Sequence, residues 1–298
     1  MALMFTKSMS MLHIAFALVV VVVWGLNWVV IKIGLGEIPP LLLASVRFFL
    51  TSLPAIFFIK RPATPFRRVV SYGLVMFSFQ FGLLFMGMYA GVTPGLASVL
   101  IQLSVFITIF FGVIFFGEKV HIWQLIGALV AFSGIGIVAM NLGGSLTLTG
   151  FLLIIGAAIS WGIGNLLSKK IGKVNMVALV VWGSLIAWPP LLLASFIMEG
   201  PDRIVYSFHH LTWLSGSAVL YITYLSTLLA FGLWSWLLHH HPLGSIAPFT
   251  LLVPVLAILS SALVLGEPLQ SWKIVAAVLV IIGLCINLLG PRFLVRKQ

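Results

Sequence analysis

Long apolar runs, repeated along the whole chain, constrain most strongly what this sequence can fold into. Each run holds about 20 residues, and a helix rising ~1.5 Å per residue needs that length to cross a ~30 Å hydrocarbon core. Gly, Pro and charged residues separate the runs. We predict ten transmembrane helices, at residues 12–34, 40–59, 69–91, 94–115, 122–141, 148–169, 176–197, 212–238, 243–265 and 272–290.

The composition makes lipid the solvent for these helices. Of the 298 residues, 62% are hydrophobic and only 7% are charged, and the mean hydropathy is +1.24. A soluble protein of this length would need far more charged residues to cover its core. The predicted fold class is therefore an all-α membrane protein in contact with the lipid bilayer. The single cysteine, Cys285, allows no disulfide framework.

The basic residues predict the orientation of the chain in the membrane. A net charge of +11 would suit a nucleic-acid partner, but the basic residues form short clusters between apolar runs, so we expect no nucleic acid. Short cytoplasmic loops are enriched in Lys and Arg, and one set of alternate loops and ends holds nearly all of them. Both termini should therefore be cytoplasmic. The residues of this set are Lys7, Lys60, Arg61, Arg67, Arg68, Lys119, Lys169, Lys170, Lys173, Arg292, Arg296 and Lys297.

The chain contains an internal repeat of five helices. An odd number of crossings forces the second copy, at residues 148–290, to run opposite to the first, at 12–141, so the repeats are inverted. Inverted repeats are typical of alternating-access carriers with a site near the midplane, although duplication without transport is the alternative. The repeated motifs are Trp24-Gly25 with Asn27 and Lys32, matched by Trp161-Gly162 with Asn165 and Lys169, and Gly117-Glu118 with Trp123, matched by Gly266-Glu267 with Trp272.

Arg47 is the sharpest candidate for a binding residue. It lies roughly 10 Å into the second predicted helix at ~1.5 Å per residue, where a charge is costly unless it faces a cavity or a partner. The repeat places no basic residue near the matching Ser184. A role in binding and a role as a structural anchor both remain open. Lys32 is either a snorkelling lysine at a helix end or, with Arg47, part of a vestibule that attracts anions.

Uncharged polar and aromatic residues inside the predicted helices complete the candidate site. The polar ones can hydrogen-bond a substrate or a neighbouring helix with equal ease. The two tryptophans are counterparts in the repeat and lie deeper than the interfacial belt, which favours a cavity wall. The candidates for substrate binding are Trp24, Asn27, Arg47, Gln80, Gln102, Trp161, Asn165 and Tyr224.

The acidic residues limit the substrate class. All five, Glu37, Glu118, Glu199, Asp202 and Glu267, fall in loops or at helix ends. A pump for lipophilic cations requires a buried carboxylate, so a substrate that itself carries a carboxylate suits this chain better. No enzyme motif, cofactor motif or metal-ligand spacing is present, and the run His239 to His241 projects in several directions from one helix end, so we expect no catalysis, cofactor or metal.

Five segments in the right order make the sequence resemble a known family. They are VVVVWGLNWVVIKIGL from Val20, PPLLLASVRFFL from Pro39, PGLASVLIQ from Pro94, GEKVHIWQLIGALV from Gly117 and LLVPVLAILSSALVLGE from Leu251. The chain resembles the EamA family of the drug/metabolite transporter superfamily, and within it the branch that exports O-acetylserine and cysteine, in which a glutamine such as Gln102 also occurs. One position departs from the family pattern, because many relatives have a proline where this chain has Val105, the counterpart of Pro254.

The resemblance implies a secondary transporter that exports small amino-acid-like metabolites by alternating access across the bacterial inner membrane. Two alternatives stay open. One is a carrier of the same superfamily for a nucleotide-like, sugar-like or lipid-linked solute. The other is a membrane sensor or assembly protein that transports nothing. The sequence leaves the oligomeric state and the energy source undetermined.

Overall fold

The computed structural model describes residues 10–142, 146–172, 174–241 and 243–295. Ten stretches of helix within the described residues are long and apolar enough to cross a membrane, which confirms the predicted all-α fold with ten spans. The spans are Met11–Gly34, Pro40–Phe57, Phe66–Tyr89, Pro94–Phe116, Ile122–Met140, Leu148–Ile171, Met176–Met198, Trp213–Leu237, Pro248–Leu265 and Ser271–Gly290.

Several spans are built from more than one helical segment. The α-helices are α1 (Met11–Gly34), α2 (Pro40–Ser52), α3 (Phe66–Tyr72), α4 (Gln80–Tyr89), α5 (Pro94–Leu100), α6 (Leu103–Phe116), α7 (Ile122–Met140), α8 (Leu148–Ile171), α9 (Met176–Met198), α10 (Pro201–His209), α11 (Trp213–Leu220), α12 (Ala230–His240), α13 (Leu243–Thr250), α14 (Leu252–Leu265) and α15 (Ser271–Val295). A 3₁₀ turn, η1 (Ala55–Phe57), extends the second span. Two π-helical segments, η2 (Gly73–Phe79) and η3 (Tyr221–Leu229), lie inside the third and eighth spans.

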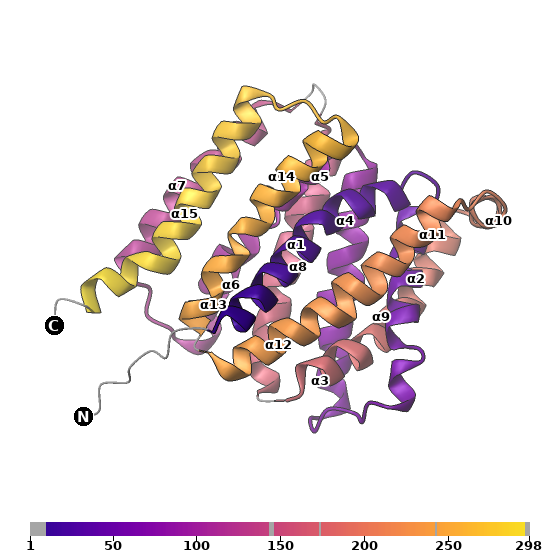
Figure 1. The fold of residues 1–298 in the computed structure, drawn as a ribbon, viewed down its shortest axis with the longest axis horizontal. Helices are drawn as coiled ribbons and strands as arrows, with labels where there is room; N and C mark the ends of the chain where they lie inside the picture. Colours follow the sequence, from indigo (N-terminus) through magenta and orange to yellow (C-terminus); the bar gives the residue numbers. More distant parts are fainter. Residues whose placement is uncertain (1–9, 143–145, 173, 242, 296–298) are drawn as a thin grey trace.

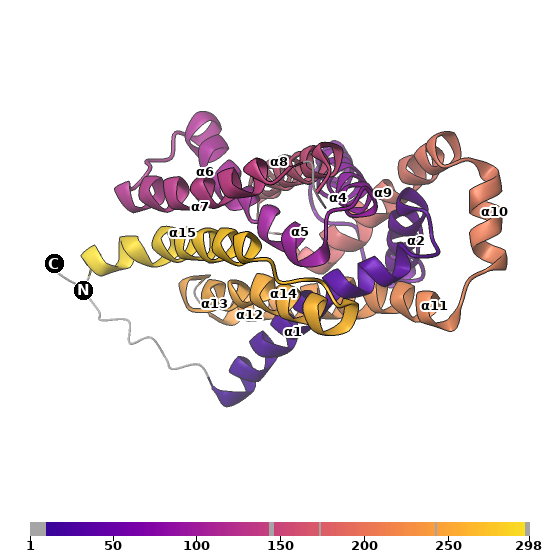
Figure 2. The same cartoon turned by 90° about the horizontal axis from the view of Figure 1, so that it is seen from above.

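The two faces of the bundle follow from the even number of spans. The start of α1 at Met11 and the end of the tenth span at Gly290 lie at the same face, which we call the terminal face. The other face, at which α1 and α14 end, is the opposite face. Figures 1 and 2 show α7 and α15 side by side as a peripheral pair, next to the main group of helices.

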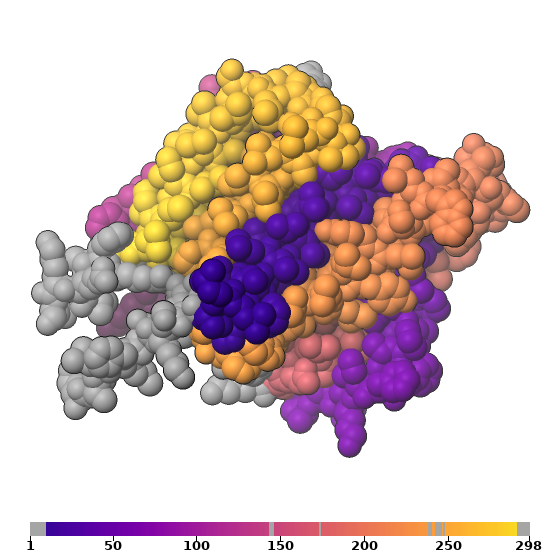
Figure 3. Space-filling view, in the orientation of Figure 1, coloured from indigo at the N-terminus to yellow at the C-terminus, as the bar shows by residue number. Residues whose placement is uncertain are grey.

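The halves pack on each other through reciprocal contacts. Gly25 of α1 leaves room for the side chain of Leu256 of α14, and its repeat counterpart, Gly162 of α8, leaves room for Ile107 of α6. Without a Cβ at either glycine the paired helices approach closely, as small residues allow in membranes. Figure 3 shows α1 on one face of the molecule between α14 and the α11–η3–α12 span.

The fourth and ninth spans are interrupted, which the sequence did not lead us to expect. We predicted continuous helices at 94–115 and 243–265, but α5 ends at Leu100 before α6 begins, and α13 and α14 are separated at Leu251. In the ninth span, Pro254 has no N–H with which to continue the helical ladder. In the fourth span, Val105 has an N–H but donates it to the Gln102 carbonyl, at 3.1 Å. That carbonyl is three residues back, whereas an α-helix bonds the carbonyl four residues back.

A short amphipathic helix, α10, lies between the seventh and eighth spans, where we predicted a loop. Ile204 and Ser207 are buried on one side of it, whereas Tyr206 and Phe208 are each 63% exposed. The spans also expose many large apolar side chains on the outside of the bundle, including Leu129 in α7, as expected for surfaces that contact lipid chains.

Candidate functional site

Arg47 is buried, with only 2% of its surface exposed. It comes from α2, and its Nε donates a hydrogen bond of 3.0 Å to Oγ1 of Thr227 in η3. The guanidinium carbon lies 4.3 Å from the ring centroid of Phe81 in α4. Stacking on an aromatic face stabilises a desolvated guanidinium and fixes its plane. The arginine therefore joins three spans from both halves of the chain.

The charge of Arg47 has no carboxylate partner among the described residues. Its Nη1 atom is buried without a hydrogen-bond partner, and the two ion pairs in the described ranges, Lys169–Glu118 and Lys273–Glu267, lie elsewhere. A buried cation is costly unless it is paired. This arrangement fits a site that receives its counter-ion from an incoming ligand.

Gln80 carries further unused hydrogen-bonding capacity next to Phe81. The side chain is fully buried, and both the Nε2 and Oε1 atoms lack partners. Oγ1 of Thr223 in η3 is likewise buried without a hydrogen-bond partner. An unpaired buried polar group costs about 1–3 kcal/mol, so such groups call for a functional reason. The amide of Gln80 offers a ligand both a donor and an acceptor.

The two π-helical segments occupy matching positions in the two halves. Gln80 directly follows η2, and η3 carries Thr223, Ser226 and Thr227. A π-helical stretch inside an α-helix often marks a functional site, because it shifts the side chains and loosens the backbone ladder. These three hydroxyl residues are not among the candidates predicted from the sequence. Ser and Thr are common in membrane helices, and nothing in their spacing distinguishes them.

Trp24 lies against the same π-helical segment. Its Nε1 donates to the Ser226 carbonyl at 3.1 Å, and its ring contacts Phe231 and Trp234 with centroid distances of 5.2 and 5.6 Å. One turn further along α1, Asn27 is 8% exposed and its Oδ1 has no partner. Trp24 and Arg47 thus both bind η3, Trp24 at Ser226 and Arg47 at the next residue, Thr227.

The remaining predicted residues lie apart from Arg47. Asn165 donates to Thr108 Oγ1 at 3.0 Å, which ties α8 to α6, and Trp161 packs against the main core. Gln102 sits at the break between α5 and α6, the kind of helix interruption found at transporter sites. Tyr224 is 36% exposed on the surface of the bundle, so it does not join the group around Arg47.

Lys32 and Arg47 have different partners in the structure. Lys32 Nζ donates to the Met88 carbonyl at 3.3 Å, whereas Arg47 is bound to Thr227. A polar cavity of about 420 Å³ opens nearby at the opposite face, lined by Leu35, Gly36, Glu37, Ile38, Pro39, Tyr89, Arg203, Tyr206 and His210.

Two acids of the opposite face tie the halves together. Glu37, after α1, accepts hydrogen bonds of 2.9 Å from the N–H and the hydroxyl of Thr212, which lower the pKa of its carboxyl group. Glu199, after α9, accepts from the first N–H groups of α2, at Leu41 and Leu42. A carboxylate at a helix N-terminus is stabilised by the unpaired N–H groups and the helix dipole.

Comparisons with known proteins agree with this architecture. The EamA-like transporter family matches residues 11–140 and again residues 148–289. A probable amino-acid metabolite efflux pump of Salmonella typhimurium is 41% identical over 93% of this chain and 94% of its own length. A protein of the same description from Escherichia coli K12 is 40% identical over 93% of this chain and 95% of its own.

More distant similarities extend the comparison. An uncharacterized inner membrane transporter of Escherichia coli K12 is 25% identical over 90% of this chain and 88% of its own. A solved crystal structure of 17% identity has a TM-score of 0.65 and covers 95% of this chain and 98% of its own, which supports the fold. Two matches of one family together span nearly the whole sequence, one in each five-span half. The chain is a multi-pass membrane protein that belongs to the EamA-like transporter family, a family of transporters and not of enzymes.

Proposed function

We propose that this chain exports small amino-acid-like metabolites bearing a carboxylate, by alternating access of two repeats at residues 12–141 and 148–290. The observation that carries the proposal is Arg47, a buried guanidinium between the two halves with an unpaired Nη1 atom. Relatives described as probable amino-acid metabolite efflux pumps, at 41% and 40% identity, support the cargo class.

The chemistry around Arg47 suits an amino-acid-like cargo. Arginine binds carboxylates through paired N–H groups in a fixed plane, and the Phe81 ring holds that plane here. The Gln80 amide oxygen provides an acceptor for an ammonium group, and the hydroxyl of Thr223 a further polar contact. The side chains of Arg47, Gln80 and Thr223 are buried in this structure, so the surrounding helices must move before cargo can reach them.

The orientation follows from the basic residues. Clusters such as Lys60 with Arg61, and Lys169 with Lys170, lie at the terminal face, which we therefore place in the cytoplasm. The membrane is the bacterial inner membrane, as for the related inner membrane transporter. A reporter fusion after Gln298 tests this orientation, because alkaline phosphatase fused there should be inactive and a cytoplasmic reporter active.

The cargo proposal is tested by counterflow in proteoliposomes. O-acetylserine and cysteine are compared with their amide and ester analogues, for the wild type and for Arg47→Gln. We expect Arg47→Gln to lose the preference for carboxylates, whereas Arg67→Gln, which changes an exposed arginine, should keep it. An equal loss for carboxylates and esters would assign Arg47 a structural role.

The same assay separates the alternatives. Flux of a nucleotide sugar or a lipid-linked solute in place of amino acids would show a different cargo. If no labelled solute moves although the reconstituted protein is folded, the chain is a sensor or an assembly protein and the proposal fails.

A further inference from the structure

The reciprocal packing of the halves makes specific residues counterparts of one another. Gly162 against Ile107 repeats the contact of Gly25 with Leu256, at the same sequence offsets that relate the Trp-Gly and Gly-Glu motifs. By the same offsets, Lys169 is the counterpart of Lys32, and both lie near the ends of their helices. Glu118 is likewise the counterpart of Glu267, each directly after a left-handed glycine that ends a helix.

Only one of the two corresponding ion pairs is formed. At the terminal face, Lys169 of α8 pairs with Glu118 after α6, and the Lys169 Nζ also lies 4.7 Å from the Phe116 ring centroid. At the opposite face, Lys32 instead donates to the Met88 carbonyl at 3.3 Å. Two equivalent helix pairs, α8 with α6 and α1 with α14, therefore end in different ionic contacts.

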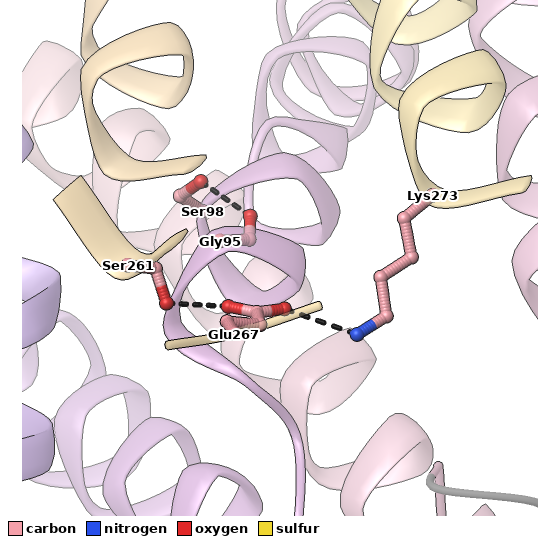
Figure 4. A network of polar contacts seen from close by, with 5 residues as sticks. All are labelled: Gly95, Ser98, Ser261, Glu267 and Lys273. Carbon is pink, nitrogen blue, oxygen red and sulfur yellow. Dashed lines mark hydrogen bonds and ion pairs between the residues drawn. The ribbon is translucent and has the colours of Figure 1, made fainter. Parts of the chain in front are cut away.

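Glu267 is held in a separate network while it is not paired with Lys32. Figure 4 shows its carboxylate between the Ser261 hydroxyl and the Lys273 ammonium group, with which it forms an ion pair of 3.1 Å. The Glu267 side chain is only 8% exposed, so leaving its charge without a partner would be costly.

The first half has no equivalent of this holding network. The positions that match Ser261 and Lys273 are Gly112 and Gln124, and the Gln124 side chain caps the N–H of His121 instead. Lys169 is accordingly the only ion-pair partner that the described residues offer to Glu118. Glu267 is nearly buried and thus has a second partner in the state in which Lys32 is withdrawn, whereas the Glu118 side chain is 46% exposed and can be hydrated when its pair opens.

In a carrier with inverted repeats, the two access states arise when the halves exchange conformations. A contact that one half makes at one face in one state is then made by the other half at the other face in the second state. Resting on the alternating access proposed above, we infer that Lys32 and Glu267 pair in the other state and close the opposite face, while the Lys169–Glu118 pair opens. Both residues thus position the two states and need not touch cargo.

Cross-linking tests this pairing without any cargo, so its result stands even if the cargo class is wrong. Cys285→Ala removes the single native thiol. Into this background we introduce Lys32→Cys with Glu267→Cys, and separately Glu118→Cys with Lys169→Cys. A short bifunctional methanethiosulfonate bridges them, because an ion pair leaves the Cα atoms further apart than a disulfide allows. The pair Lys32→Cys with Lys169→Cys, on opposite faces, is the negative control.

We expect both counterpart pairs to cross-link and the control pair not to. In a variant with all four cysteines, molecules bridged between positions 118 and 169 should largely lose cross-linking between positions 32 and 267, because the bridge holds the state in which these two positions are apart. Two bridges formed independently in one molecule, or no bridge between 32 and 267 while 118 and 169 react, would overturn the inference.

Charge reversal separates pairing with Lys32 from the structural pair with Lys273. Glu267→Lys and Lys32→Glu should each abolish transport, and the triple variant Lys32→Glu, Glu267→Lys and Lys273→Glu, which reverses both pairs, should restore it. If Glu267 serves only Lys273, Glu267→Lys with Lys273→Glu will restore transport without a change at Lys32. Size-exclusion profiles identify variants that fail to fold, and for those the cross-linking result alone decides.

Discussion

At the scale of single residues, Gln80 offers the sharpest separation of function from stability. Both polar atoms of this fully buried side chain lack partners, so its desolvation cost of about 1–3 kcal/mol is unrecovered in the structure. Gln80→Leu should therefore keep or raise the Tm of the detergent-solubilised protein while it lowers transport. Functional sites commonly hold such destabilising groups.

The control for this prediction is Gln124, a partly exposed glutamine near the start of α7 whose side chain makes a structural hydrogen bond. Gln124 accepts a hydrogen bond of 2.8 Å from the His121 N–H. Gln124→Leu removes this helix cap, so it should lower the free energy of unfolding by about 1 kcal/mol and with it the Tm. Transport per folded molecule should stay unchanged. A Tm loss for Gln80→Leu as large as for Gln124→Leu would mean that Gln80 serves the fold.

Thr227 is the residue that fixes Arg47. Its Oγ1 accepts from Arg47 Nε at 3.0 Å and donates to the Ile222 carbonyl at 2.7 Å. Thr227→Val keeps the shape but removes both bonds, and the unpaired guanidinium should cost about 1–3 kcal/mol. We expect weaker cargo affinity and a lower Tm, both recovered by Thr227→Ser. The measurement is substrate KM in proteoliposomes together with thermal unfolding.

The candidate site was only partly predictable at this scale. Arg47 could be found because a charge deep in an apolar run is rare and costly. The two residues that contact Arg47, Thr227 and Phe81, could not be predicted from the sequence. A hydroxyl group or an aromatic ring inside a membrane helix is ordinary and becomes distinctive only once the helices are packed. Tyr224 was named from its amphipathic side chain alone, and the π-helical turn of η3 directs it outward at 36% exposure.

At the scale of helices, the peripheral pair of α7 and α15 depends on close backbone approach. A Cβ added to Gly283 would overlap the carbonyl of Gly127, which cannot move aside without shifting its helix. Gly283→Ala should therefore destabilise the protein by about 1–3 kcal/mol, as overpacking does. Gly136→Ala is the matched control, because that glycine of α7 is exposed and has open space at its Cβ position. Equal Tm values for the two variants would contradict this account.

The terminal face holds a contact between α1 and the end of α12 that should respond to pH. His13 Nδ1 and His241 Nε2 lie 2.6 Å apart, so one ring donates and the other must be neutral to accept. Burial lowers the pKa of His241, and the neighbouring His13 and His240 lower it further. A lowered pKa means that the bond is complete above the ordinary value of about 6.5 and is lost as the pH falls through the lowered value.

The lowered pKa of His241 predicts how the stability of the protein depends on pH. The wild type should lose Tm relative to His241→Gln as the pH falls from about 7 towards 5, because protonation costs the wild type its bond and the variant has none to lose. His209→Gln, on the exposed face of α10, should show no such convergence with the wild type. A constant Tm difference across this pH range would show that protonation does not break the histidine contact.

Helix breaks mark the limit of what periodicity can predict at this scale. Pro254 signals a discontinuity, and one exists just before it at Leu251. Val105 carries no such signal, yet α5 and α6 separate at the matching place. In the fourth span the break shows only in the backbone hydrogen bonds, where the Val105 N–H bonds the Gln102 carbonyl three residues back.

At the scale of the whole molecule, the number of spans and the repeat were predictable because both depend on sequence alone. Length and hydropathy set the spans, and the recurrence of the Trp-Gly and Gly-Glu motifs indicated the two halves. The relative arrangement was not predictable, since the contacts of Arg47 and Trp24 with η3 depend on how the two halves meet. Such contacts lie far apart in sequence and leave no local pattern.

The whole molecule also predicts how export is driven. Four acids have partners at the ends of spans: Glu37 with Thr212, Glu118 with Lys169, Glu199 with the start of α2, and Glu267 with Lys273. The fifth, Asp202, is exposed in α10. Proton antiporters commonly titrate an acid within the membrane, so we expect flux here to follow the cargo gradient and, for charged cargo, the membrane potential at ~2.3 kcal/mol per charge per 100 mV.

Proteoliposomes under an imposed pH gradient, with the potential clamped by K⁺ and valinomycin, test this expectation. A cargo gradient alone should drive flux, and a pH gradient alone should give no accumulation above equilibrium. The buried Glu267 is the acid best placed to prove this wrong, since its pairing changes between the two states inferred above. Accumulation that is driven by pH alone and abolished by Glu267→Gln would identify proton exchange coupled to that carboxylate. Because the Glu118–Lys169 pair is about half exposed, Glu118→Gln should leave the response to pH unchanged.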